Sequence, residues 1–66
     1  MQILLNDQPR EVAPGASLGD FLAGLGLAPR GVAVAVNGAV APRSTWATRP
    51  LAEGDRVLVI QATQGG

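Results

Sequence analysis

The side chains of the first residues are expected to alternate between the two faces of a strand. Ile3 and Leu5 share one face of residues 2–6, a period of two that predicts a strand. Residues 6–9 are turn formers, and residues 10–13 predict a second strand. We therefore expect the chain to open with a β-hairpin.

The apolar period then changes from two to about 3.6. Four apolar residues fall at helical spacing: Leu18, Phe21, Leu22 and Leu25. Ser17 and Asp20 have the spacing of a capping box, in which each side chain satisfies a free backbone N–H at the start of a helix. Gly26 is placed to take the left-handed conformation after the last turn. These features predict one helix of about two turns.

A second hairpin is indicated in the middle of the chain. Residues 32–36 alternate strictly between Val and Ala, which is typical of a strand. The Asn-Gly pair at 37–38 is a strong signal for a tight turn, and residues 39–41 would form a short returning strand.

The remaining segments complete a predicted architecture. Residues 42–51 have no regular period and Trp46 is expected to anchor them, whereas residues 56–61 predict a last strand. Strand, strand, helix, strand, short strand, strand is the order of the β-grasp fold, an α+β class with one helix packed on a mixed sheet of four to five strands. We expect one domain over residues 1–61 and a flexible C-terminal tail over 62–66.

A single helix can cover only one side of such a sheet, so the alternation assigns each residue a face. The residues expected to face the helix are Ile3, Leu5, Val12, Val34, Val36, Val57 and Val59. The residues expected to face away are Leu4, Ala33, Ala35, Leu58 and Ile60. We expect the outward residues, with Leu4, Ala35, Leu58 and Ile60 as the principal contacts, to form an apolar patch that docks a partner protein. The alternative is an ordinary scatter of apolar surface side chains.

Composition narrows the possible functions. The chain has no cysteine and no histidine, and we take this to exclude a disulfide, iron–sulfur ligation, thiol catalysis, a zinc site and a histidine general base. Five arginines balance five acidic residues, so nucleic-acid binding is not expected. No apolar run approaches the roughly 18 residues that a membrane span requires. The first residues do not read as a secretion signal, and a cytoplasmic location is expected.

Several short motifs together resemble one family. They are the opening Met-Gln-Ile-Leu with Asn-Asp-Gln at 6–8, Ala-Val-Asn-Gly at 35–38, Pro-Arg at 42–43 followed by Trp-Ala at 46–47, Gly-Asp at 54–55, and the terminal Gly65-Gly66. In this order the sequence resembles the sulfur carrier proteins of thiazole (thiamine) biosynthesis over its full length. The small subunit of molybdopterin synthase shares the fold and the diglycine end, and remains an alternative together with a ubiquitin-like protein modifier.

The resemblance implies that the chain is a cosubstrate, not an enzyme. An ATP-dependent adenylyltransferase similar to ubiquitin-activating enzymes would adenylate the Gly66 carboxylate, and sulfur from a cysteine desulfurase would convert it to a thiocarboxylate for thiazole synthase. The carrier itself would bind no cofactor, because ATP is used by the partner. Thr63, Gln64 and Gly65 would enter the partner's active site, where glycine avoids the Cβ atoms that a narrow channel cannot accept.

Overall fold

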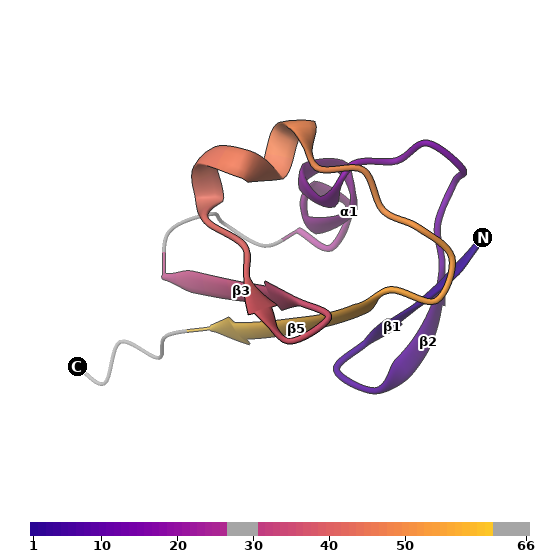
Figure 1. Cartoon of the computed structure of the whole chain (residues 1–66), viewed down its shortest axis with the longest axis horizontal. Coiled ribbons are helices and arrows are strands. Elements are labelled where there is room, and N and C mark those ends of the chain that lie inside the picture. The colour runs from indigo at the N-terminus through magenta and orange to yellow at the C-terminus, as the bar shows by residue number, and fades with distance from the viewer. Residues whose placement is uncertain (27–30, 62–66) are drawn as a thin grey trace.

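The computed structural model describes residues 1–26 and 31–61. The elements in chain order are β1 (Gln2–Leu5), β2 (Gln8–Glu11), α1 (Leu18–Gly24), β3 (Val32–Val36), β4 (Ala39–Val40), the 3-10 helix η1 (Arg43–Thr48) and β5 (Arg56–Gln61). Both helices lie on one side of the strands (Figure 1). The predicted element order is therefore confirmed, with one helical segment added.

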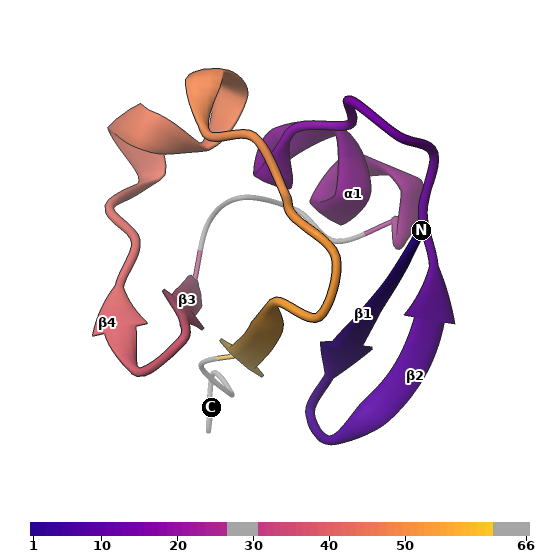
Figure 2. The same cartoon turned by 45° about the vertical axis from the view of Figure 1, so that its right-hand side comes forward.

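The five strands form one mixed sheet in the order β2-β1-β5-β3-β4. The central pair, β1 and β5, is parallel, and every other neighbouring pair is antiparallel. Figure 2 shows α1 and η1 above the sheet, and no helix formed by residues 1–26 and 31–61 lies below it. The predicted α+β β-grasp class, with one α-helix on a mixed sheet, is confirmed, and the sheet has five strands.

The second strand differs from the prediction. It spans Gln8–Glu11 and not residues 10–13, because the turn before it consists of only two residues, Asn6 and Asp7, with φ of 48° and 69°. Such a tight left-handed turn matches the twist of the strands it joins and pairs Leu5 directly with Gln8. Pro9 is tolerated inside this strand because β2 is an edge strand, so an absent N–H need not break a ladder.

The helix begins as the capping box predicts. The backbone N–H of Asp20 donates to Ser17 Oγ at 3.0 Å, and the N–H of Ser17 donates to Asp20 Oδ2 at 3.2 Å. Leu18 and Leu22 are buried against the sheet. Gly26 adopts a φ of 75°, which confirms the predicted left-handed residue after the helix.

The segment predicted to be irregular contains the 3-10 helix η1. Its anchor is Trp46, whose side chain is 7% exposed and whose Nε1–H donates to the carbonyl oxygen of Ala41 at 2.8 Å. A buried indole needs a partner for its N–H, and this carbonyl supplies one. The predicted anchoring role of Trp46 is confirmed, and the regular structure around it was missed.

The hydrophobic core lies between the helices and the sheet. It consists of Ile3, Leu18, Leu22, Val34, Val36, Ala41, Trp46, Leu51 and Val57. Four of the seven residues predicted to face the helix are buried in this core, and Leu5, Val12 and Val59 are partly buried against it. The alternation therefore assigned the inner face correctly, and the other face of the sheet is left for solvent or a partner.

Candidate docking face

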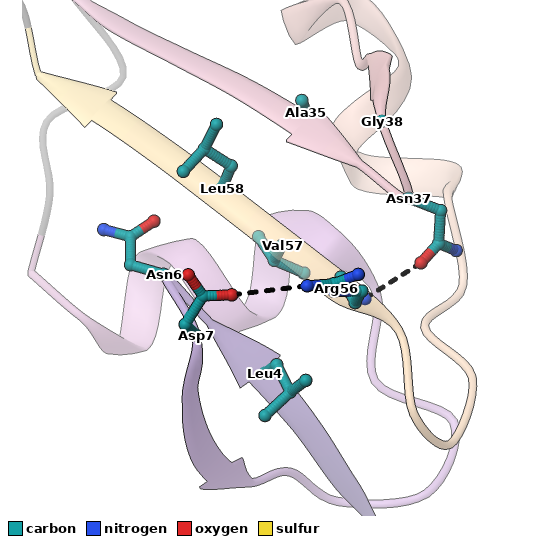
Figure 3. A pocket seen from close by; sticks show the side chains of 9 residues that line it. All are labelled: Leu4, Asn6, Asp7, Ala35, Asn37, Gly38, Arg56, Val57 and Leu58. Carbon is teal, nitrogen blue, oxygen red and sulfur yellow. Dashed lines mark hydrogen bonds and ion pairs between the residues drawn. The ribbon is translucent and has the colours of Figure 1, made fainter.

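The uncovered side of the sheet carries the residues predicted to face outward. Leu58 and Ile60 of β5 are 48% and 57% exposed. Both are large apolar side chains that expose about half of their surface to solvent. Ala33 is exposed, whereas Leu4 and Ala35 are half-buried. Figure 3 shows Leu4, Ala35 and Leu58 projecting from three neighbouring strands. The structure therefore brings the predicted docking residues together on one face.

Strand register arranges these residues in rows across the sheet. Ala35 of β3 lies opposite Leu58 of β5, and Ala33 lies opposite Ile60. On its other side Ala35 lies opposite Val40 of β4, so Val40 belongs to the same face. We call Leu4, Ala33, Ala35, Val40, Leu58 and Ile60 the open face.

Val40 is the residue of the open face that sequence reasoning missed. Its side chain is 80% exposed, the most exposed large apolar side chain among residues 1–26 and 31–61. The signal was present, because a two-residue turn at 37–38 pairs residue 36 with 39 and residue 35 with 40. Val40 widens the apolar surface by one strand.

One end of the open face is polar. Arg56 lies opposite Leu4 in the parallel pair, and its Nη2 is 3.5 Å from Asp7 Oδ1. Both side chains of this ion pair are largely exposed, so water screens it and the pair contributes little to stability. A pocket of about 500 Å³ lies here, with Leu4, Ala35 and Leu58 among its apolar residues and Asp7, Asn37 and Arg56 among its polar ones (Figure 3).

Asn37 stabilises the turn at this polar end. Its Nδ2 donates to Asp55 Oδ1 at 3.0 Å, and its Oδ1 accepts the backbone N–H of Arg56 at 3.0 Å. The residue has a φ of 52° and is followed by Gly38 with a φ of 85°, which are the left-handed angles expected for an Asn-Gly hairpin turn. These bonds fix the loop before β5 relative to the second hairpin.

The predicted reacting end lies outside the described residues. The tail over 62–66, with Thr63, Gln64, Gly65 and Gly66, begins immediately after Gln61, the last residue of β5. Leu58 and Ile60 lie on that same strand, four and two residues, respectively, before the tail begins at residue 62. The strand at the centre of the open face therefore leads directly to the proposed reacting end.

The described residues show no candidate metal site and no unpaired buried polar side chain. Within residues 1–26 and 31–61, no three His, Cys, Asp or Glu side chains gather in a way that could hold a metal ion. In the same part of the chain, every buried side-chain nitrogen or oxygen has a hydrogen-bond partner. No helix among these residues has the length and apolar character to cross a membrane.

Comparison with known proteins gives a consistent result. The model of the ThiS family matches residues 3–66. The chain is 38% identical over 66 residues to the sulfur carrier protein ThiS of Escherichia coli, with both chains covered completely. The chain is also 41% identical over 66 residues to a thiazole synthase of Magnetococcus marinus. This alignment covers all of the present chain and 20% of the thiazole synthase.

Solved structures agree with the sequence matches. The crystal structure of the thiamine biosynthesis protein ThiS from Geobacter metallireducens superimposes with a TM-score of 0.83 at 28% identity, and both chains are covered completely. SAMP1 from Haloferax volcanii superimposes with a TM-score of 0.63 at 19% identity, with 98% of this chain and 97% of that one covered. The second likeness supports the fold alone.

Proposed function

Because the chain belongs to the ThiS family and is a sulfur carrier protein rather than an enzyme, we propose that it carries sulfur as a thiocarboxylate on Gly66. The thiocarboxylate then donates its sulfur to the thiazole ring of thiamine. The observation that carries this proposal is the family match, which extends through residue 66 and includes the diglycine.

The chemistry requires activation in a partner. A carboxylate is a poor electrophile because its charge is delocalised, so its oxygen first attacks the α-phosphorus of ATP and pyrophosphate leaves. The product is a mixed anhydride with AMP. A cysteine desulfurase supplies sulfur as a persulfide, and a thiol reduces this sulfur to the sulfide level and is itself oxidised to a disulfide. The resulting hydrosulfide attacks the carbonyl carbon, AMP leaves, and the thiocarboxylate remains. The carrier has neither cysteine nor histidine, so the groups that promote these steps belong to the adenylyltransferase.

The terminal residues suit a group that reacts inside another protein. Five residues follow Gln61, and an extended chain of that length reaches about 16–18 Å. Gly65 and Gly66 have no Cβ, which lets the end of the chain pass through a narrow channel. This reach supports a reaction in a cleft while the folded body stays on the partner's surface.

The open face is the proposed docking surface for the adenylyltransferase and for thiazole synthase. Its apolar side chains would bury against a partner, and burial of exposed apolar area is the main driving force of association. The match to a thiazole synthase that is about five times as long supports thiazole synthase as a partner class. The proposed compartment is the cytoplasm, where ATP is available for the activation step.

The test is ATP–pyrophosphate exchange with the cognate adenylyltransferase. We compare the parent with a Gly66 deletion and with Gly65→Val, using Gly24→Ala in the folded body as the matched glycine control. Deletion retracts the carboxyl group by about 3.3–3.6 Å, and misplacing a reacting atom by about 1 Å can lower a rate about a hundredfold. Both tail variants should therefore lose exchange while the control keeps it. Parental exchange by the Gly66 deletion would refute the proposed reacting site.

A further inference from the structure

Strand β5 extends further along the sheet than its parallel neighbour. β1 ends at Leu5, which lies opposite Val57, whereas β5 continues to Gln61. Beyond this point β1 offers no further backbone partner, although β3 still pairs with β5 on the other side as far as Gln61. The side of β5 next to β1 therefore needs another source of hydrogen bonds.

The side-chain amide of Asn6 supplies them. The backbone N–H of Val59 donates to Asn6 Oδ1 at 2.9 Å, and Asn6 Nδ2 donates to the carbonyl oxygen of Val59 at 3.3 Å. The backbone N–H of Asn6 also donates to the carbonyl oxygen of Val57 at 2.9 Å. A primary amide offers the same donor and acceptor as a peptide unit, so Asn6 prolongs the parallel ladder by one position.

The backbone of Asn6 makes this possible. Its φ of 48° turns the chain away from β5 into the hairpin, and asparagine tolerates this left-handed conformation better than most residues. The side chain remains beside the last strand, as Figure 3 shows. The main chain turns away from the sheet after Leu5, and the side-chain amide of Asn6 takes over the hydrogen bonds to Val59.

A second turn asparagine provides a comparison at the opposite end of β5. Asn37 has a φ of 52°, and its Oδ1 accepts the backbone N–H of Arg56 at 3.0 Å. Asn37 therefore braces the first residue of β5, whereas Asn6 braces the strand at Val59. Only the Asn6 brace lies at the end that leads into the proposed reacting tail.

We propose that Asn6 is a positioning residue for the sulfur-carrying reaction, because it fixes the direction in which β5 delivers residues 62–66. This role rests on the proposed use of the Gly66 carboxyl group as the reacting group. Once the open face has docked, the effective concentration of that group in the partner's active site depends on how freely the base of the tail moves. Releasing Val59 would leave the whole end of β5, from Val59 to Gln61, held by β3 alone.

The test compares Asn6→Gly with Asn37→Gly. Glycine keeps the left-handed turn in both variants and removes the amide, so the two differ mainly in which end of β5 is released. NMR order parameters need no partner: in Asn6→Gly those of Ile60 and Gln61 should fall from about 0.85 toward 0.6. Adenylation should show a kcat lowered about three- to tenfold with a nearly unchanged KM. Asn37→Gly should leave the order parameters of Ile60 and Gln61 near parental values. Gly24→Ala in α1, on the covered side of the sheet, is the control for kcat and KM and should leave both near parental values.

A conservative variant and the contrary results complete the design. Asn6→Asp keeps an acceptor for the Val59 N–H and should restore part of the lost kcat. Equal order parameters at Gln61 in the two glycine variants, or a kcat for Asn6→Gly equal to that of Gly24→Ala, would overturn the positioning role. A parent protein that is not adenylated would instead overturn the proposed function, and the order parameters would still decide whether Asn6 holds the base of the tail.

Discussion

Gly19 of α1 packs directly against the backbone of Trp46. A β-carbon at Gly19 would lie 3.2 Å from both the carbonyl carbon and the carbonyl oxygen of Trp46. This carbonyl cannot shift easily, because the Trp46 side chain is buried and its Nε1–H is hydrogen-bonded to the carbonyl oxygen of Ala41. The close approach of α1 and η1 therefore depends on the absence of a side chain at residue 19.

The Gly19→Ala variant should lose stability even though alanine is the better helix former. Overpacking at a fixed contact costs about 1–3 kcal/mol, which exceeds the gain of about 1 kcal/mol from helix propensity. Gly24→Ala is the control, because nothing lies within 4 Å of its added β-carbon, and it should be neutral or stabilising. Urea denaturation followed by circular dichroism measures both. A Gly19→Ala protein as stable as Gly24→Ala would show that η1 moves freely.

Trp46→Phe should destabilise the protein, because it removes one hydrogen bond and part of a buried ring. Phenylalanine keeps an aromatic ring in the core but has no N–H for the carbonyl oxygen of Ala41, which the indole satisfies at 2.8 Å. Leaving a buried acceptor unpaired costs about 1–3 kcal/mol. Because Trp46 is the only tryptophan, the comparison needs circular dichroism rather than fluorescence. An unchanged urea midpoint would contradict the anchoring role of the Trp46 side chain.

Leu58→Asp and Ile60→Asp should separate docking from folding. Both side chains project from the uncovered side of the sheet and are about half exposed, so the free energy of unfolding should change little. Binding to the adenylyltransferase should weaken by a few kcal/mol, since a charge would be buried at the contact. Calorimetry of binding measures this, with Gln8→Asp on the distant edge strand β2 as the control. Two folded variants that bind like the parent would exclude the open face as the docking surface.

Much of the fold could be predicted because local patterns and global structure agree. The period of two placed Val34, Val36 and Val57 in the core, and the capping box placed the start of α1. The shift of β2 was missed because Pro9 resembles a turn residue, and only the position of β2 at the sheet edge makes it acceptable in a strand. A 3-10 helix such as η1 has no apolar period of its own to reveal it.

The site was predictable to a similar extent. The outward residues followed from alternation, and their neighbourhood followed from the strand order of the fold. The hydrogen bonds from the side chains of Asn6 and Asn37 to the backbone of β5 could not be predicted. A side-chain amide that substitutes for a peptide unit produces no periodic pattern in the sequence. Both residues appear there only as ordinary turn formers. Such contacts depend on the relative lengths of neighbouring strands, which only the assembled sheet reveals.

The most direct measurement is the intact mass of the protein co-expressed with its own adenylyltransferase and cysteine desulfurase. Exchange of one carboxyl oxygen for sulfur should raise the mass by about 16 Da, and the Gly66 deletion should stay unmodified under the same conditions. Conjugation of the tail to a lysine of another protein would instead produce a much larger amide-linked species. A mass that remains that of the unmodified chain under full activating conditions would contradict sulfur carriage on Gly66.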